Sequence, residues 1–311
     1  TQASFQLEHL RCSSDQDSLD GIVVRGQGIA LVDGTRPHIV EPRYPGCQDE
    51  IINFGEFWDR QGICGHLKEI VSLSQEISER YARIYRLLAA ANQLSLDWSA
   101  SHSQGLDSKG VNQVAMNLCA SFSQLPIAEN GKARHLFASS LSPHGTLHYL
   151  ESILSPLKKV YVLKDTYSCC AHNVLERVLA EAKTRGLFVE VYHCALDPQR
   201  IEHLVIEELS LGFSITCAHH VYTPKEAELV DLDQFVDLSK VKETSFLNSQ
   251  KETEKQIMGW AGTELGTIKS LHDELESFYF PYMDFEATDK LLERTTERIF
   301  ELLEPSAILV P

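Results

Sequence analysis

The amino-acid sequence predicts an α/β fold made of two repeated domains, each with a parallel sheet and appended helices. The first observation is an internal repeat, in which "QLEHLRCSSDQDSLDGIVV" (6–24) matches "FVEVYHCALDPQRIEHLVI" (188–206) at an offset of 182. A second block, "IINFGEFWD" (51–59), matches "LVDLDQFVD" (229–237) at an offset of 178. Two ungapped blocks in the same order indicate a duplication. The second observation is an apolar run, a short loop and an amphipathic pattern in succession, which is typical of a parallel β–α–β unit.

Each expected element follows from its own pattern of apolar residues. In the second copy, the apolar run at 159–164 predicts a strand, and the 3.6-residue pattern closed by Gly186 predicts a helix at 171–185. Long helical patterns close both copies, with apolar side chains on one face that indicate packing rather than a cofactor site. The remaining expected elements are strands at 5–11, 28–33, 187–193 and 211–217 and helices at 66–94, 251–279 and 285–304.

The repeat also predicts the domain boundary. Residues 1–133 are expected to form the first domain, with a helical insertion at about 66–125, and residues 134–311 the second. The second copy has a strand, a loop and a helix before its first matching block, whereas the first copy opens almost at that block. The offset therefore places the expected start of the first copy about 45 residues before Thr1. On this hypothesis, the first strand, its loop and most of its helix are missing from these residues.

Composition restricts the class of protein. A hydrophobic content of 43% and a charged content of 23% are typical of a soluble globular chain. The net charge of −16 argues against a nucleic-acid partner, and the apolar runs are too short to predict a membrane span. The eight cysteines include no C-x-x-C pair, which favours free thiols and a cytoplasmic location.

The stretch "VYVLKDTYSCCAHNVLERVLAEAKTRG" (160–186) has the outline of a phosphate-binding loop. A strand leads through a short polar loop into a helix N-terminus, where backbone amides can bind a phosphate. Between strand and helix, however, the loop contains no glycine and no lysine that could meet the phosphates. The pattern therefore suggests a nucleotide site that has lost its chemistry.

Acidic residues follow the expected strands of the first copy. Asp33 ends the strand in "GIALVDGT" (28–35), where an acid can hold Mg²⁺ through water. Asp15 lies in "RCSSDQDSLDG" (11–21), after the preceding strand of the expected sheet and at its carboxyl edge. The alternatives are structural: Asp33 could form a turn before Gly34, and Ser13 or Asp15 could cap a helical turn.

Four segments together resemble a bacterial family of tandem P-loop ATPases, which carry two P-loop NTPase-like domains in one chain. These segments are "CSSDQDSLDG", "IALVDGTRPHIVEPRYPG", "DEIINFGEFWD" and "RHLFASSLSPHG", and the resemblance covers nearly the whole sequence. It implies a GxxGxGK[S/T] loop in each copy, ATP and Mg²⁺ as ligands, and Asp33 as the acid of Walker B type. The resemblance thus implies the chemistry of ATP binding and hydrolysis but no cellular pathway.

Laid on the loop of that family, the second copy departs from it at every functional position. Lys164 precedes the loop, and the aligned positions are Asp165, Ser168 and Cys170 for the glycines, Ala171 for the lysine, His172 for the Mg²⁺-binding hydroxyl residue and Asn173 for the residue after it. Side chains at glycine positions crowd a phosphate, and Asp165 would repel it. Thr216 stands where the first copy has Asp33. The second copy is therefore expected to be a silent site without bound nucleotide.

Cysteines and histidines after the strands of the second copy allow a zinc site instead. If the sheet is parallel, these side chains gather at one carboxyl edge, where thiolates and imidazoles can hold Zn²⁺. The candidate ligands are Cys169, Cys170, His172, Cys194 and His219, with His193, Cys217 and His220 beside them. Against this hypothesis, Cys12 occupies the position of Cys194 in the first copy without such partners.

The leading functional hypothesis is therefore an ATP-binding, ATP-hydrolysing protein whose site belongs to the first copy. Asp33 would hold Mg²⁺ and Asp15 would orient water, while Arg134 or His135 could supply charge from the junction between copies. Without the lysine-bearing loop, residues 1–311 are expected to be inactive. The alternative is a non-enzymatic scaffold with a protein partner bound to the helices at 66–94 and 251–279, for which the acidic surface favours a basic partner.

Overall fold

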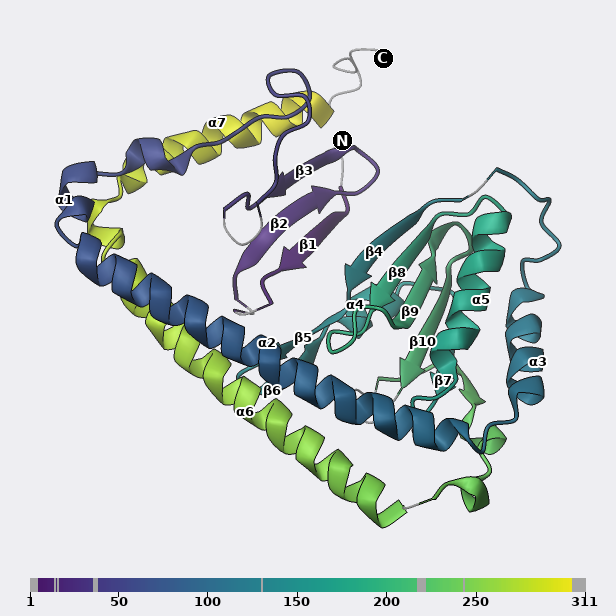
Figure 1. Cartoon of the computed structure of the whole chain (residues 1–311). Coiled ribbons are helices and arrows are strands. Elements are labelled where there is room, and N and C mark those ends of the chain that lie inside the picture. The colour runs from purple at the N-terminus through teal and green to yellow at the C-terminus, as the bar shows by residue number, and fades with distance from the viewer. Residues whose placement is uncertain are drawn as a thin grey trace. The chain divides into compact units, whose positions relative to one another are not determined.

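The computed structural model describes residues 5–13, 15, 17–35, 39–129, 131–216, 222–242 and 244–303. It is a mixed α/β structure with a six-stranded sheet, a three-stranded sheet and a two-stranded sheet (Figure 1). The chain divides into two compact units: unit 1 comprises Thr1–Tyr81 and Gly266–Pro311, and unit 2 comprises Ala82–Leu265. Each unit thus contains residues from both sides of the boundary predicted at residues 133 and 134.

Unit 2 contains the six-stranded sheet, which is mostly parallel. Its strands, from one edge to the other, are β11 (Glu228–Asp231), β7 (Lys159–Lys164), β10 (Leu211–Thr216), β9 (Ile201–Ile206), β8 (Val189–His193) and β4 (Ala133–Phe137). All run in one direction except β9, which is antiparallel to both of its neighbours. The carboxyl ends of the five parallel strands therefore meet at one edge of the sheet.

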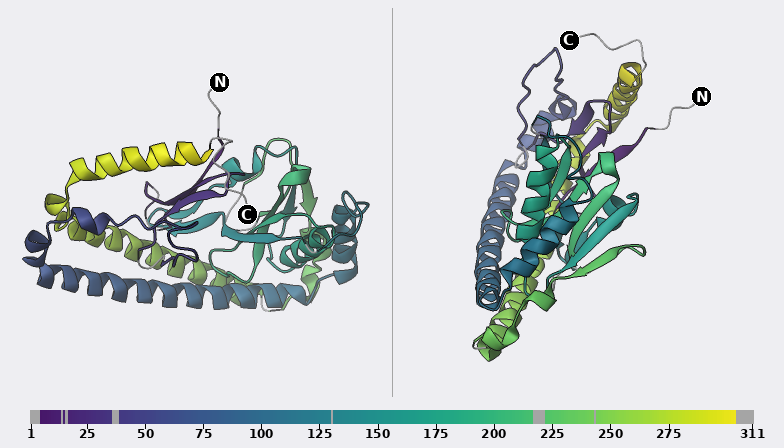
Figure 2. Two further views of the ribbon diagram at one scale, coloured as in Figure 1. Left: turned by 90° about the horizontal axis from the view of Figure 1, so that it is seen from above. Right: turned by 90° about the vertical axis from the view of Figure 1, so that its right-hand side faces the viewer.

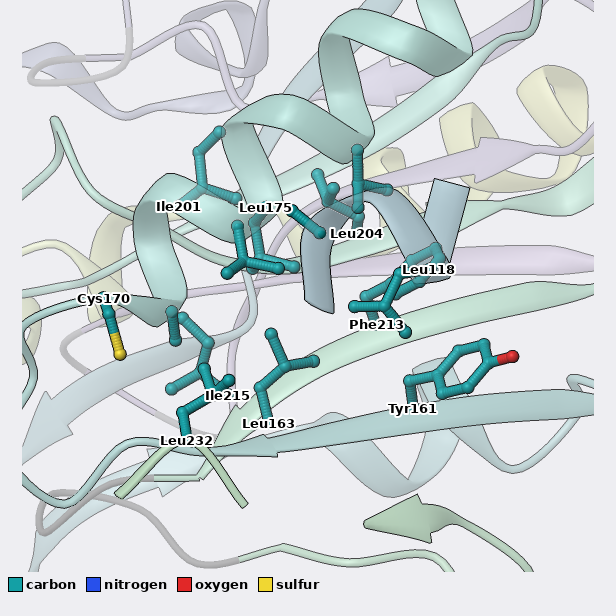
Figure 3. Packing of buried hydrophobic residues seen from close by; sticks show 14 of the residues in the cluster. Leu118, Tyr161, Leu163, Cys170, Leu175, Ile201, Leu204, Phe213, Ile215 and Leu232 are labelled. Carbon is teal, nitrogen blue, oxygen red and sulfur yellow. The ribbon is translucent and has the colours of Figure 1, made fainter. Parts of the chain in front are cut away.

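Helices cover both faces of this sheet because its strands alternate their side chains between two buried layers. On one face, Leu163 and Phe213 pack under α5 (Ala171–Thr184), beside which α3 (Ser108–Cys119) lies (Figures 1 and 3). On the other face, Val162 packs with the short helix α4 (Leu150–Leu154). The β5 (Ser139–Ser142) and β6 (Gly145–His148) hairpin precedes α4. A sheet covered on both faces accounts for the continuous apolar strands.

Unit 1 contains the three-stranded sheet of β1 (Leu7–Arg11), β2 (Leu19–Val24) and β3 (Ile29–Val32). Both pairings are antiparallel, so the prediction of a parallel sheet is wrong for the first half of the chain. The reason is local: only four residues connect β2 to β3, and Gly26 and Gly28 adopt positive φ angles of 73° and 68° there. So short a turn joins antiparallel strands, whereas parallel strands need a long crossover.

The β1–β2–β3 pairing has the same register as the β8–β9–β10 pairing in the second half of the chain. Glu8 pairs with Val23, and Glu190 pairs with Val205. An irregularity follows Leu10 in the first ladder and Tyr192 in the second. The third strands agree as well, since Gly21 pairs with Val32 and His203 pairs with Ser214. The two halves thus share a three-stranded meander, residue for residue.

Two long helices follow the sheets. They are α2 (Leu67–Ser103) and α6 (Thr244–Ser277), and each continues from one unit into the other. Within unit 2 they run antiparallel, because Arg83 forms an ion pair with Glu264 at 2.9 Å and Lys251 lies over the ring of Trp98 (Figure 2). The helices predicted at 66–94 and 251–279 are therefore confirmed. The first ends later than its apolar pattern indicated, and the second begins earlier.

The segments before the last helices pair crosswise between the halves of the chain. In unit 2, Leu106 forms a bridge with Val236, and in unit 1 Met283 forms the equivalent bridge with Trp58. The flanking hydrogen bonds are the same in both: Asp107 N–H to the Phe235 carbonyl (2.7 Å), Asp237 N–H to that of Gly105 (2.9 Å), Asp284 N–H to that of Phe57 (2.9 Å) and Asp59 N–H to that of Tyr282 (2.8 Å). Thus α3 is in unit 2 and α7 (Phe285–Leu303) is in unit 1, each paired with a segment of the other half.

Candidate phosphate-loop site

The loop between β7 and α5 closes around one of its own side chains. The Asp165 side chain is 1% exposed, and its carboxylate accepts three backbone N–H groups. Cys169 N–H donates to Oδ1 at 3.1 Å, while Cys170 N–H and Ala171 N–H donate to Oδ2 at 3.0 and 2.8 Å. These amides belong to the end of the loop and the first residue of α5, where helical N–H groups have no helical acceptor. The loop is therefore an anion-binding turn that contains a carboxylate.

Ser168 occupies the turn of this loop in a left-handed conformation, with a φ angle of 54°. Glycine adopts this conformation without cost, so the geometry matches the position at which the resemblance expects glycine. The Ser168 carbonyl accepts hydrogen bonds from Ser99 Oγ at 2.8 Å and from an Arg200 guanidinium N–H at 2.9 Å. Residues from α2 and from the end of the β8–β9 loop therefore hold the turn in place.

The lysine that precedes the loop is neutralised by two acids. Lys164 Nζ lies 3.2 Å from Asp231 Oδ2 and 3.0 Å from Asp233 Oδ2, and these contacts, led by Asp233, raise its pKa. Asp233 also accepts hydrogen bonds from the backbone N–H and the hydroxyl of Thr166. The Lys164 ammonium is thus engaged at the β11 edge of the sheet and does not take the place of the lysine that the resemblance implies at Ala171.

His172 and Asn173 lie in the first turn of α5. The His172 Nδ1 accepts the backbone N–H of Ile201 at 3.0 Å, and Nε2 lies 3.6 Å from Glu176. Burial lowers the pKa of His172, which fits an imidazole that must keep Nδ1 unprotonated to accept that hydrogen bond. Neither His172 nor Asn173 supplies the hydroxyl that would bind Mg²⁺ beside a triphosphate.

The structure brings together two of the five residues of the predicted zinc site. Among the described residues, one trio has ligand atoms that all lie within 4.8 Å of one another: Asp165, Cys169 and Cys170. A hydrogen bond with Cys169, together with burial, raises the pKa of Cys170, and burial raises that of Cys194. Both thiols would have to lose their protons to bind Zn²⁺. His172 instead binds the Ile201 amide, and His219 lies outside the described residues.

The acids of the first half cap their own turns. Asp33 Oδ1 accepts the backbone N–H of Thr35 at 2.8 Å and its hydroxyl at 2.7 Å. Asp15 accepts the Asp17 N–H at 3.2 Å and the Ser18 hydroxyl at 2.9 Å. Because β1 and β3 run in the same direction, the two acids follow strands that end at one edge of their sheet. Their roles in Mg²⁺ and water binding stay predictions.

The shared register also corrects the predicted equivalence of Thr216 and Asp33. Val32 corresponds to Ser214 at the offset of 182, so Asp33 corresponds to Ile215 and Gly34 to Thr216. Ile215 is buried in the core of unit 2. The second half therefore places an apolar side chain where the first half has a carboxylate.

Arg134 and His135, expected as charge donors, have partners on β8. Arg134 forms an ion pair with Glu190 at 3.6 Å, and His135 Nδ1 lies 2.8 Å from His193 Nε2. Burial lowers the pKa of His193, and the neighbouring His135 lowers it further. Sequence reasoning missed Ser99, Arg200 and Asp233, because each contacts the loop from a distant part of the chain.

Comparisons with protein-family models, with curated proteins and with solved structures find no match to this chain. In the part of the chain that the structure describes, no helix is both long enough and apolar enough to cross a bilayer. The geometry of the loop and of the two halves is therefore what bears on function.

Acidification is expected to destabilise the loop through His172. Its pKa in the folded state lies below the ordinary value near 6.5, so the unfolded chain takes up the proton first as the pH falls. The contribution of neutral His172 is present above that value and is lost as the pH falls through it towards the lower pKa of the folded state. Urea unfolding of the wild type and of His172→Gln at pH 7.5 and 5.5 measures this loss.

The His172→Gln variant should lose less stability than the wild type over that range. His144→Gln is the matched control, because His144 lies in the β5–β6 turn, outside the loop. Equal losses for the wild type and His172→Gln would contradict the prediction.

Proposed function

We propose that the chain is an ATP-binding and ATP-hydrolysing P-loop protein made of two NTPase-like halves. The ATP site belongs to the first half, with Asp33 holding Mg²⁺ through water and Asp15 orienting water, and the second half is a silent site. The observation that carries this proposal is the loop before α5, where three amides converge on an anion directly after a parallel strand. That arrangement resembles the phosphate cradle of P-loop proteins, here with a carboxylate inside it.

The side chains of the second-half loop support its silence. Ala171 carries no charge, and Lys164 is paired with Asp231 and Asp233. The Asp165 carboxylate occupies the amides that a phosphate would need. Phosphoryl transfer depends on positioning and charge neutralisation, so a loop with these substitutions has lost both.

Exposed apolar faces in unit 1 support a nucleotide site in the first half. In unit 2 the meander β8–β9–β10 is buried on both faces, because α5 packs on one face and α4 on the other, while β7 continues the sheet beside β10. In unit 1 the matching strands expose Leu7 and Val32, and Leu292 of α7 is 65% exposed. Ala115, its counterpart on α3, is 1% exposed and lies in the core that α5 covers. These faces fit a strand, phosphate loop and helix like those of the second half.

Titration of Mg·ATP into the complete gene product and into residues 1–311 tests the proposal. We expect binding by the complete gene product and none by residues 1–311. Asp33→Ala should weaken binding or turnover of the complete product at least about tenfold, since a charge-assisted contact is lost. Asp17→Ala, a neighbouring acid, is the control. Absence of binding by the complete product refutes the ATP site, and equal binding by residues 1–311 refutes the silent second half.

A scaffold without catalysis is the second candidate. Exposed aromatic side chains on the unit 2 parts of the long helices favour it, namely Tyr85 on α2 and Trp260 on α6. The net charge of −16 would then select a basic protein partner. This candidate gains if the complete gene product fails to bind Mg·ATP.

A further inference from the structure

We propose that Asp165 is a built-in anion that replaces phosphate in the second-half loop and satisfies the buried amides of this loop without any ligand. The inference rests on the proposed identity of the loop as a former phosphate site, and it is independent of ATP binding by the first half. It assigns to Asp165 a positive structural role, where the sequence alone indicated only repulsion of phosphate.

The carboxylate satisfies the donors that a phosphate would satisfy. Three amides reach it at 2.8–3.1 Å, and two of them, from Cys170 and Ala171, share Oδ2. Asp165 and the three residues that donate to it, Cys169, Cys170 and Ala171, are all buried. Their N–H groups therefore have no access to bulk water. Buried donors without an acceptor are strongly destabilising, and the positive end of α5 favours an anion at this point. Asp165 therefore supplies both the acceptors and the charge.

The cradle has support that does not depend on Asp165. Ser99 and Arg200 hold the Ser168 carbonyl, and Tyr167 stacks on His102 of α2 with ring centroids 4.6 Å apart and planes inclined by 14°. The loop is thus fixed from α2 and from the β8–β9 side. Removing the carboxylate should leave a preformed nest of amides rather than a collapsed loop.

The loop contacts α2 while the built-in anion is in the cradle. With Asp165 in the cradle, Ser99 and His102, which come from the first half of the chain, always meet a closed loop. The second half then works as a fixed support for α2 and responds to no nucleotide.

Chemical rescue by inorganic phosphate tests this role directly. Thermal unfolding of residues 1–311 is measured for the wild type and Asp165→Gly, in chloride and in phosphate of equal ionic strength. We expect Asp165→Gly to melt about 5–10 °C lower in chloride. Phosphate should restore at least about half of this loss, because it fills the vacated nest, while shifting the wild type by no more than about 1 °C.

Asp233→Ala is the matched control. It removes an acid that also binds a loop amide, at Thr166, but leaves the Asp165 carboxylate in the cradle. Its melting temperature should be lower than that of the wild type, and phosphate should raise it no more than it raises that of the wild type. If Asp165→Gly does not fold, the same phosphate rescue is measured on Asp165→Ser, which removes the carboxylate but keeps a short polar side chain. Phosphate that stabilises neither Asp165 variant more than the wild type would overturn the inference, as would an Asp165→Gly variant as stable as the wild type in chloride.

Discussion

Phe213→Ala is expected to lower the free energy of unfolding by about 3–5 kcal/mol. Phe213 lies on β10, a central strand of the six-stranded sheet, and its side chain is fully buried. Its ring stacks on Tyr161 of β7 with centroids 5.5 Å apart, and Leu204 of β9 belongs to the same cluster (Figure 3). Truncation removes a large apolar side chain and leaves a cavity that strands on both sides prevent from closing.

Urea unfolding followed by circular dichroism measures this loss, and Phe137→Ala is its control. Phe137 lies on β4 at the edge of the same sheet and is 57% exposed, so its truncation should cost less than about 1 kcal/mol. If the two variants were equally stable, β10 would not be the centre of the core.

Gly105→Ala is expected to destabilise the protein by about 3 kcal/mol, at the upper end of the cost of overpacking. Gly105 belongs to the segment between α2 and α3, and its carbonyl accepts the N–H of Asp237. A methyl group at Gly105 would meet the Asp237 carbonyl oxygen well inside van der Waals distance. The atoms that the methyl group would meet belong to the Asp237 backbone, so no side chain can turn away to make room. The substitution therefore probes the crosswise pairing between the halves.

Gly259→Ala provides a control of opposite sign. Gly259 lies inside α6, and an added methyl group would meet nothing within 4 Å. Alanine favours a helix over glycine by about 0.5–1 kcal/mol, so this variant should be more stable than the wild type. Thermal unfolding of both variants at one pH compares them. If Gly105→Ala were as stable as the wild type, the close approach of the Gly105 and Asp237 backbones would be contradicted.

Much of the fold could be predicted from local patterns. The apolar run that ends at Lys164 and the helix closed by Gly186 lie where periodicity predicted them. Both elements bury their apolar side chains in the same core, so the apolar pattern reports their structure. The strands β2 and β9 were missed. Their residues follow acidic loops, and their pairing is set by the turns that follow them, such as the one at Gly26 and Gly28. Strand direction depended on connection length, which apolar periodicity does not report.

The position of the loop between β7 and α5 was predicted, but the hydrogen bonding of Asp165 within it was not. The sequence indicated that Asp165 would repel phosphate, whereas the structure places its carboxylate on the three amides of the cradle. That outcome depends on the left-handed turn at Ser168. A serine in the sequence does not predict this conformation, which is uncommon for residues other than glycine. It also depends on Ser99 and Arg200, which reach the turn from distant parts of the chain.

The exchange of last helices makes the two halves of the chain interdependent. Unit 1 takes α7 and part of α6 from the second half, just as unit 2 takes α3 and part of α2 from the first. A deletion of the second half would remove not one module but pieces of both. Each half is therefore needed to complete both units, whatever its own loop binds.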